Sequence, residues 1–312
     1  EVAAFRREGP YRDGRRPEYV EFCGPEEDAK RRDFTVNGIF YDPVTDTILD
    51  WVGGREDLRA RRIRAIGDPA ERFAEDHLRI LRGVRFAATL EFTLERRTAD
   101  AMRERAGTLT RISPERIRVE LTRILTESVR PGDALRLLLA LGILEVLLPE
   151  VAAMVGQEQP PLFHPEGDVF THTALMLNAM EERSPELAFS VLLHDVGKPP
   201  TAAREPGGRI RFDRHAAVGA EMARDILRRL RFSNRFIDTV ARAVGDHMRF
   251  MDVPHMKRST LRKMVSAETF PLELALHRLD CEQSHGKMDS YERVLQALGE
   301  WNNEPRLPPR RI

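Results

Sequence analysis

The chain has 312 residues, which is enough for two or three domains at roughly 100–200 residues each. Lys and Arg total 50, and so do Asp and Glu, so net charge gives no support for nucleic-acid binding and any basic surface must be local. The cysteines Cys23 and Cys281 lie far apart and fit no metal-ligand spacing, which indicates a reducing, cytoplasmic location. The longest apolar stretch, residues 134–155, is interrupted by charged residues, so it predicts core helices and excludes a membrane span there.

The N-terminal region, residues 1–57, mixes two strand-like runs (20–22 and 34–41) with turns, as the end of an α/β domain would. Acidic residues precede a pair of arginines and Asp33. Arg32 can neutralise phosphate oxygens and Asp33 can accept hydrogen bonds from ribose hydroxyls. This segment is therefore a candidate for nucleotide binding.

Residues 75–86 predict one continuous helix with a buried apolar face. Glu75, Arg79 and Arg82 then form a stripe on another face, and Asp76 lies beside Arg79. A carboxylate next to a guanidinium places an acceptor beside a donor. Cytosine and adenine both present an amine beside a ring nitrogen acceptor, so one Asp–Arg pair can select these two bases against uracil and guanine. The alternative is a weakly stabilising set of surface salt bridges.

Residues 58–150 are predicted to be helical, and one helix begins at Ser113-Pro114. The arginines of that helix favour RNA contact or a solvated face, and both interpretations stay open. A Pro-rich segment, residues 157–161, is a predicted linker.

The region 162–300 holds an ordered series of histidines and aspartates in a helical context. The series comprises His172, His194-Asp195, His215, His247 and Asp280. The His194-Asp195 pair ends an apolar run and can share an ion if flanking helices supply His172 and Asp280. Mixed imidazole and carboxylate ligands suit Mn, Fe, Ni, Mg or Zn. The alternative is a scatter of buried histidines.

Four segments of the first half resemble one known family. They read Arg-Arg-Asp-Phe-Thr-Val-Asn at 31–37, Asp-Trp-Val-Gly-Gly-Arg-Glu-Asp-Leu at 50–58, Glu-Asp-His-Leu-Arg-Ile-Leu-Arg-Gly-Val-Arg-Phe-Ala at 75–87, and Ile-Ser-Pro-Glu-Arg-Ile-Arg-Val-Glu-Leu at 112–121. In this order and spacing they resemble the bacterial tRNA nucleotidyltransferase and poly(A) polymerase family, the CCA-adding enzymes and their A-adding relatives. The resemblance covers about residues 1–150.

This resemblance implies a mainly α fold. It comprises the remnant of an α/β nucleotidyltransferase head (1–57), a helical neck and body (58–150) and an all-α HD domain (162–300). It also implies Mg²⁺, ATP and CTP as cofactor and substrates, and the tRNA 3′ end as partner. Both CCA-adding and A-adding members use the same Asp–Arg pair, so both activities stay open. The residues expected to bind nucleotide are Arg32, Asp33, Glu75, Asp76, Arg79, Arg82 and Arg85.

The chain departs from the family at its start. The family's Gly-Gly turn and its Asp-x-Asp pair, which hold the catalytic Mg²⁺, have no counterpart, and no Asp-x-Asp occurs in the 312 residues. Phosphoryl transfer needs such carboxylates to hold the metal. We therefore expect the sequence to be truncated at its N-terminus and to lack nucleotidyl transfer as it stands.

The histidine series resembles the HD phosphohydrolase superfamily and, from His164-Pro165-Glu166 onward, the HD domain fused to CCA-adding enzymes. The expected ligands of a divalent ion such as Mn²⁺, Ni²⁺ or Mg²⁺ are His172, His194, Asp195 and Asp280, with His215 and His247 orienting phosphate or completing a second site. Three function classes remain: a tRNA nucleotidyltransferase adding CMP and AMP, or AMP alone; an HD phosphohydrolase with an RNA-recognising N-terminal half; and a non-catalytic RNA-binding fragment.

Overall fold

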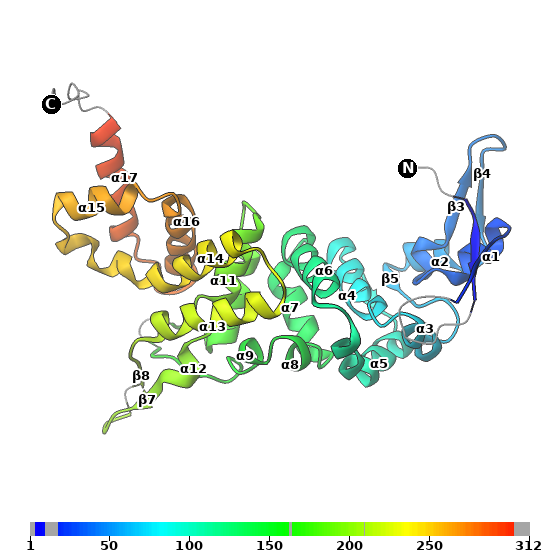
Figure 1. Cartoon of the computed structure of the whole chain (residues 1–312), viewed down its shortest axis with the longest axis horizontal. Helices are drawn as coiled ribbons and strands as arrows, with labels where there is room; N and C mark the ends of the chain where they lie inside the picture. The colour runs from blue at the N-terminus through cyan, green and yellow to red at the C-terminus, as the bar shows by residue number, and fades with distance from the viewer. Residues whose placement is uncertain (1–3, 10–17, 162–163, 209, 303–312) are drawn as a thin grey trace. The chain divides into compact units, whose positions relative to one another are not determined.

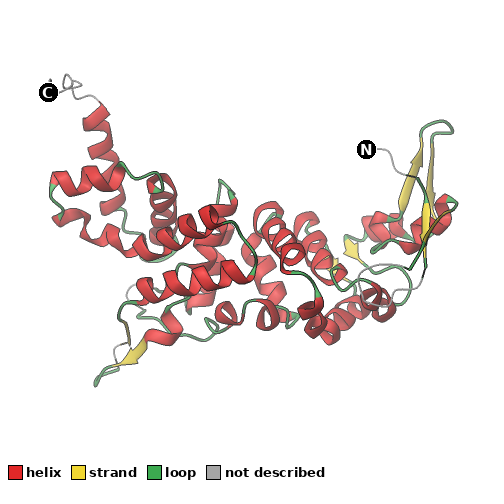
Figure 2. Cartoon of the chain, in the orientation of Figure 1, coloured by secondary structure: helices red, strands yellow, loops and turns green. Residues whose placement is uncertain are grey.

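The structure is a computed structural model that describes residues 4–9, 18–161, 164–208 and 210–302. It divides into two compact units. Unit 1 comprises Glu1–Ala153 with Ile226–Phe232, and unit 2 comprises Met154–Asp225 with Ser233–Ile312. Helices dominate both units, and all the strands in the described residues are short (Figure 2). The predicted mainly α class is thereby confirmed.

Unit 1 begins with short strands and continues as helices (Figure 1). Its elements are β1 (Arg6–Glu8), β2 (Val20–Phe22), α1 (Pro25–Arg31), η1 (Thr35–Asn37), β3 (Ile39–Asp42), β4 (Thr47–Asp50), α2 (Gly54–Arg59), β5 (Arg62–Ile63), α3 (Pro69–Glu75), α4 (Arg79–Leu90), β6 (Thr93–Leu94), α5 (Arg96–Arg105), η2 (Ala106–Arg111), α6 (Pro114–Glu127), α7 (Pro131–Ala140), α8 (Leu144–Leu147) and α9 (Pro149–Ala152).

The strands of unit 1 form two antiparallel hairpins, β1–β2 and β3–β4, and one parallel pair, β5–β6. The predicted strand at 20–22 is confirmed as β2. The predicted strand at 34–41 is wrong in its first half, because Thr35–Asn37 is a 3-10 turn and the strand begins only at Ile39. The Thr35 hydroxyl donates to the buried carboxylate of Asp57 at 2.7 Å, which holds this turn against α2.

The predicted continuous helix over 75–86 is also wrong, because the structure has two helices there. α3 ends at Glu75, α4 begins at Arg79, and Asp76 has an extended backbone (φ −138°, ψ 107°). Its carboxylate accepts from the backbone N–H of Leu78 at 3.1 Å. An Asp side chain that bonds to backbone two residues ahead offers an alternative to the helical hydrogen bond. The break follows from this local contact.

The core of unit 1 lies where α4 packs against α6 and α7, and α3 against α5. α6 starts at Pro114 with Ser113 as its N-cap, as predicted. Its apolar face is buried, and so is that of α4. The predicted core helices over 134–155 correspond to α7, α8 and α9.

Unit 2 is helical apart from one small hairpin, β7–β8. Its elements are α10 (Val169–Ala179), α11 (Pro185–Leu193), α12 (Lys198–Thr201), β7 (Ala202–Arg204), β8 (Ile210–Phe212), α13 (His215–Arg229), α14 (Asn234–Asp246), η3 (His247–His255), α15 (Arg258–Val265), α16 (Phe270–Glu282) and α17 (Asp289–Asn302). The last residues of α13 are counted with unit 1. The predicted linker precedes α10 within unit 2 and has no helix or strand.

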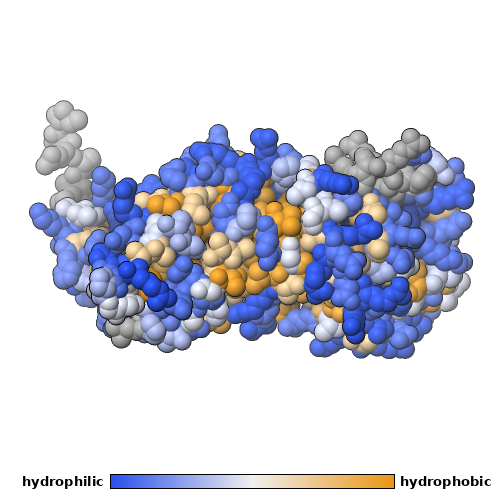
Figure 3. Space-filling view, turned by 90° about the horizontal axis from the view of Figure 1, so that it is seen from below, coloured by the Kyte–Doolittle hydropathy of each residue, from blue (hydrophilic) through white to orange (hydrophobic). Residues whose placement is uncertain are grey.

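The centre of unit 2 is α11, which is buried along its length from Leu187 to Leu193. It packs against α10, α14 and α16. A helix that is apolar all round must be surrounded, which explains why the His194-Asp195 pair at its end is also buried. Hydrophilic residues cover much of the face seen in Figure 3, with hydrophobic residues gathered between them. None of the helices in the described part of the chain is long and apolar enough to cross a bilayer.

Candidate nucleotide pocket and metal centre

A pocket of about 600 Å³ opens in unit 1, beside the break between α3 and α4. Five of the seven residues predicted to bind nucleotide line it: Arg32, Asp33, Asp76, Arg79 and Arg82. The rest of the lining comprises Arg6, Glu8, Arg31, Asn37, Leu78, Phe86 and Arg116. Cations therefore outnumber carboxylates around this pocket, although the whole chain has a formal net charge of zero.

Asp76 is paired differently from the sequence-based expectation. Its carboxylate accepts from Arg116 Nη2 at 2.9 Å, across from α6, whereas Arg79 donates to Glu75 at 2.5 Å and to the carbonyl of Arg72 at 3.1 Å. The expected bracing of Arg79 by Glu75 is present in the structure. Arg79 is only 7% exposed. Asp76 and Arg79 thus line one pocket without a side-chain bond between them.

Asp33 and Arg82 form an ion pair on the pocket wall, with Arg82 Nε donating to Asp33 Oδ2 at 2.6 Å. The other oxygen of Asp33 accepts from the backbone N–H of Phe34 and from the amide of Asn37. About a third of the Arg82 side chain is exposed. Arg32 donates to Asp28 at 3.0 Å and to the carbonyl of Asn37 at 2.8 Å. These contacts fix the side chains that the sequence assigned to phosphate and ribose.

Arg85 lies elsewhere. It is 3% exposed and its Nε is 3.3 Å from Glu120 of α6. Burial lowers the pKa of Arg85 and raises the pKa of Glu120. The structure places Arg85 between α4 and α6, outside the pocket lining, so its expected contact with triphosphate finds no support.

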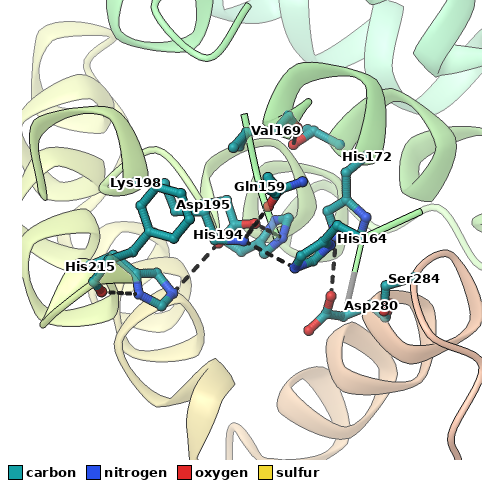
Figure 4. Close-up of polar contacts among 12 residues, drawn as sticks. Gln159, His164, Val169, His172, His194, Asp195, Lys198, His215, Asp280 and Ser284 are labelled. Carbon is teal, nitrogen blue, oxygen red and sulfur yellow. Dashed lines mark hydrogen bonds and ion pairs between the residues drawn. The ribbon is translucent and has the colours of Figure 1, made fainter. Parts of the chain in front are cut away.

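A second constellation lies in unit 2, where the predicted histidine series comes together (Figure 4). α10 supplies His172, the end of α11 supplies His194 and Asp195, and α16 supplies Asp280. His215 begins α13, and His247 follows α14. Among these six residues, two groups have ligand atoms within 4.8 Å of one another: His172, His194 and Asp280 in one, and Asp195, His215 and His247 in the other.

Three of these histidines are held in one orientation by the backbone. The Nδ1 atoms of His194, His215 and His247 lie 2.8, 2.8 and 2.6 Å from the carbonyl oxygens of residues 191, 212 and 244. A carbonyl can only accept, so each Nδ1 carries a proton, and the lone pair of each ring in its neutral form lies at Nε2.

Those lone pairs converge on Asp195. His194 Nε2 is 3.1 Å from one carboxylate oxygen, and the Nε2 atoms of His215 and His247 are each 3.7 Å from the other. The Nε2 atoms of His215 and His247 are only 3.3 Å apart. His194 Nε2 and Asp195 Oδ1 are buried without a hydrogen-bond partner. Facing lone pairs beside a carboxylate suit a shared cation, so these residues fit a divalent metal ion.

The electrostatics differ from one group of the centre to the next. Burial lowers the pKa of His247 to about 4, so its ring is neutral at pH 7. Burial would raise the pKa of Asp195, but His194 and Lys198 outweigh it and hold that pKa well below its usual range. Burial likewise opposes charge on His172, but Asp280 and Glu166 raise its pKa to about 9.

Two charged side chains of the centre, Lys198 and Glu166, were not among the ligands expected from the sequence. Lys198 Nζ, buried on α12, lies 2.7 Å from Asp195 and 2.6 Å from Gln159 Oε1. Glu166 contacts His164 and His172. The only sequence feature that pointed to Glu166 was the His164-Pro165-Glu166 segment, which contributes to the resemblance to HD domains.

Gly197 shows how tightly this centre is packed. A Cβ added there would lie 2.2 Å from the carbonyl oxygen of His215 and 2.7 Å from the amide nitrogen of Gly219. Backbone atoms cannot move aside as side chains do, so we expect Gly197→Ala to reduce the free energy of unfolding by about 1–3 kcal/mol or more. Urea unfolding followed by circular dichroism measures it. Gly245→Ala, which meets only the methyl of Ala220 at 3.4 Å, is the matched control. Equal stability of the two variants would contradict this packing argument.

Three family models match the chain. They describe a poly(A) polymerase head domain (residues 1–64), a probable RNA and SrmB-binding site of polymerase A (91–155) and an HD domain (168–289). The A-adding tRNA nucleotidyltransferase of Deinococcus radiodurans is 37% identical, covering 91% of this chain and 68% of that protein. The CC-adding tRNA nucleotidyltransferase of Thermus thermophilus is 41% identical, covering 72% of this chain and only 52% of that protein.

A solved structure supports the same relationship. The CCA-adding enzyme of Bacillus stearothermophilus in complex with CTP superposes with a TM-score of 0.64 at 25% identity, covering 98% of this chain and 70% of that one. The resemblance drawn from the four segments and from the histidine series is thereby confirmed. The chain belongs to the tRNA nucleotidyltransferase family, in the branch that carries a poly(A) polymerase-type head and an HD domain.

Proposed function

We propose that unit 1 binds ATP and CTP as substrates for addition to tRNA 3′ ends. The observation that carries this proposal is the pocket in which Asp76, Arg79 and Arg116 stand together. A carboxylate acceptor beside guanidinium donors matches the amine and ring nitrogen edge of adenine and cytosine. The relatives whose names describe A-adding and CC-adding activity support the same choice of nucleotides.

The charge of the pocket supports a triphosphate ligand. Its lining has six arginines against three carboxylates, namely Glu8, Asp33 and Asp76. Arginine forks bind phosphate oxygens in a bidentate manner, and they do so more strongly where water is partly excluded. We assign Arg82 and Arg32 to phosphate contact and Asp33 to the ribose, with Glu75 bracing Arg79.

We assign no residues to the metal ions of the transferase reaction. No Asp-x-Asp pair occurs in the sequence, and within the described residues every group of three metal-competent side chains belongs to unit 2. Unit 1 is therefore proposed to bind and orient the nucleotide, and no transfer step is assigned to its residues.

Arg82→Ala tests the assignment of phosphate binding. The variant should bind ATP, CTP, GTP and UTP all more weakly than the wild-type chain, by a similar factor of about ten each, because the triphosphate is common to the four. Isothermal titration calorimetry with each nucleotide measures this. Arg96→Ala, an almost fully exposed arginine on α5, is the control and should change nothing. A change in the order of preference would mean that Arg82 reads bases.

We further propose that unit 2 is a metal-dependent phosphohydrolase centre. The observation that carries this second function is the convergence of imidazole lone pairs and the unpartnered oxygen of Asp195. The ligands are His172, His194, Asp195 and Asp280, and a bound Mn²⁺, Ni²⁺ or Mg²⁺ would supply an activated water for attack on a phosphate ester. His215 and His247 orient the scissile phosphate or complete a second site.

The proposed substrate is a 2′,3′-cyclic phosphate or a phosphomonoester at an RNA end. This choice follows from the companion unit, whose relatives act on tRNA ends. The test assays the purified chain, with added Mn²⁺, Ni²⁺ or Mg²⁺, on cyclic nucleotides and on RNA ending in a phosphomonoester. We expect release that depends on the ion and stops on chelation. Hydrolysis that persists in excess chelator would contradict the proposal.

A further inference from the structure

Glu166 lies directly behind one of the proposed metal ligands. Its Oε1 is 2.6 Å from Nδ1 of His172 and 2.9 Å from Nδ1 of His164. Its side chain is 9% exposed, and that of His172 is fully buried. The opposite nitrogen of the His172 ring, Nε2, is 3.1 Å from Asp280 (Figure 4). The ring therefore spans two carboxylates, of which only Asp280 belongs to the proposed ligand set.

His172 differs from the other histidines of the centre in how its ring is held. His194, His215 and His247 each face a carbonyl oxygen three residues earlier. His172 lies inside α10, where nearby carbonyls accept helix hydrogen bonds, and it has a carboxylate at Nδ1 instead. Glu166 is the acceptor within reach of His172 Nδ1 at 2.6 Å, although that nitrogen as placed makes no hydrogen bond of good geometry, whereas each of the other three rings has a carbonyl partner.

This difference matters because a neutral imidazole has one N–H and one lone pair. A ring that offers Nε2 to an ion must carry its proton on Nδ1, and an acceptor at Nδ1 fixes that tautomer and the ring orientation. A carboxylate acceptor also makes the ligating nitrogen more basic. We propose that Glu166 is a positioning residue that holds His172 in the tautomer that binds metal, an inference that rests on the proposed metal centre.

His164, Glu166 and His172 could instead form a separate ion site, since one ligand atom of each lies within 4.8 Å of the others. That site would use Nδ1 of His172, while the group with His194 and Asp280 lies on its Nε2 side. A neutral ring has only one lone pair to give. The chemistry therefore favours a proton between His172 and Glu166.

The experiment measures Ni²⁺ affinity of the chelator-treated 312-residue chain by isothermal titration calorimetry, for the wild type, Glu166→Ala and Glu166→Gln. Glu182→Gln, an exposed glutamate of the same unit, is the control. We expect Glu166→Ala to bind about 10–100-fold more weakly. Glu166→Gln keeps an acceptor oxygen, so its Ni²⁺ affinity should fall less than that of Glu166→Ala. Circular dichroism verifies folding, and Glu166→Asp replaces the alanine variant if that variant does not fold.

A second readout separates positioning from a general loss of structure. Long-range ¹H–¹⁵N correlation of the Zn²⁺-loaded protein reports the tautomer of each histidine. We expect Nδ1–H for His172 in the wild type and in Glu166→Gln, and a mixed state in Glu166→Ala with His194, His215 and His247 unchanged. Ni²⁺ affinity within twofold of wild type in Glu166→Ala, or an unchanged His172 tautomer there, would overturn the inference. The inference would also be overturned if Glu166→Ala bound one Ni²⁺ fewer than the wild type and held the remaining Ni²⁺ with unchanged affinity.

A His194→Ala variant distinguishes the failure of this inference from failure of the metal centre. If His194→Ala abolishes Ni²⁺ binding while Glu166→Ala leaves it unchanged, only the role of Glu166 is wrong. If the wild type binds no ion, or His194→Ala binds as the wild type does, the metal centre is wrong and the role of Glu166 fails with it.

Discussion

Replacing Asp195 with asparagine should reduce divalent-metal affinity at least 100-fold and abolish hydrolysis in unit 2. The carboxylate is 1% exposed and lies within 3.7 Å of ring nitrogens of His194, His215 and His247. Asparagine keeps the shape and one acceptor oxygen but removes the charge that an ion would neutralise. Because Asp195 and Asp280 are the two anionic ligands of the proposed set of four, the negative charge of Asp195 contributes a large part of the attraction for the ion.

Metal content after dialysis and Ni²⁺ calorimetry measure this effect. The matched control is Asp238→Asn, whose carboxylate is 69% exposed and pairs with Arg224 on the surface. It should bind metal as the wild type does. A folded Asp195→Asn protein, verified by circular dichroism, that still retains wild-type affinity would eliminate Asp195 as a ligand.

Removing the carboxylate of Asp76 should abolish the preference for ATP and CTP over GTP and UTP. A bidentate base contact contributes about 1–3 kcal/mol of discrimination, which corresponds to a factor of roughly 5–150 in relative affinity. Asp76→Ala removes the acceptor, and Arg79→Lys replaces a planar fork with a point charge. Both variants should bind the four nucleotides with similar affinity.

The measurement is equilibrium binding of each nucleotide to the 312-residue chain. Glu71→Ala, an exposed carboxylate on α3, is the control and should keep the preference. A third variant, Arg116→Ala, removes the guanidinium that donates to Asp76 at 2.9 Å. Its loss should weaken the preference for ATP and CTP. If selectivity persists in both Asp76→Ala and Arg79→Lys, these residues do not read the base.

The sequence located the residues of the proposed metal centre better than those of the proposed nucleotide pocket. His172, His194, Asp195 and Asp280 could be selected because chemistry-bearing residues stand out in an otherwise apolar helical context. The structure brings all four together with His215 and His247. A role for Glu166 could not be predicted because a glutamate in a loop belongs to no periodic pattern. Its proposed role depends on its distance to His172, which only the structure gives.

The pocket was harder to predict because its ion pairs join residues that lie far apart in the sequence. Helical periodicity placed Asp76 beside Arg79, but the break after Glu75 turns the Asp76 carboxylate to Arg116, forty residues later in the chain. Arg85 was expected among the nucleotide-binding residues because of the resemblance. Its burial against Glu120 depends on how α4 packs against α6, which spacing along one helix does not contain.

The distance along the chain between the ligands has a consequence for biosynthesis. His172 and Asp280 are 108 residues apart, and the remaining ligands come from segments between them. A ribosome makes these residues in order, so the earlier histidines emerge long before the carboxylate of α16 can join them. Binding of the proposed ion would therefore come late, after assembly of α10, α11 and α14, and a newly made chain would fold most of unit 2 before all the proposed ligands are in place.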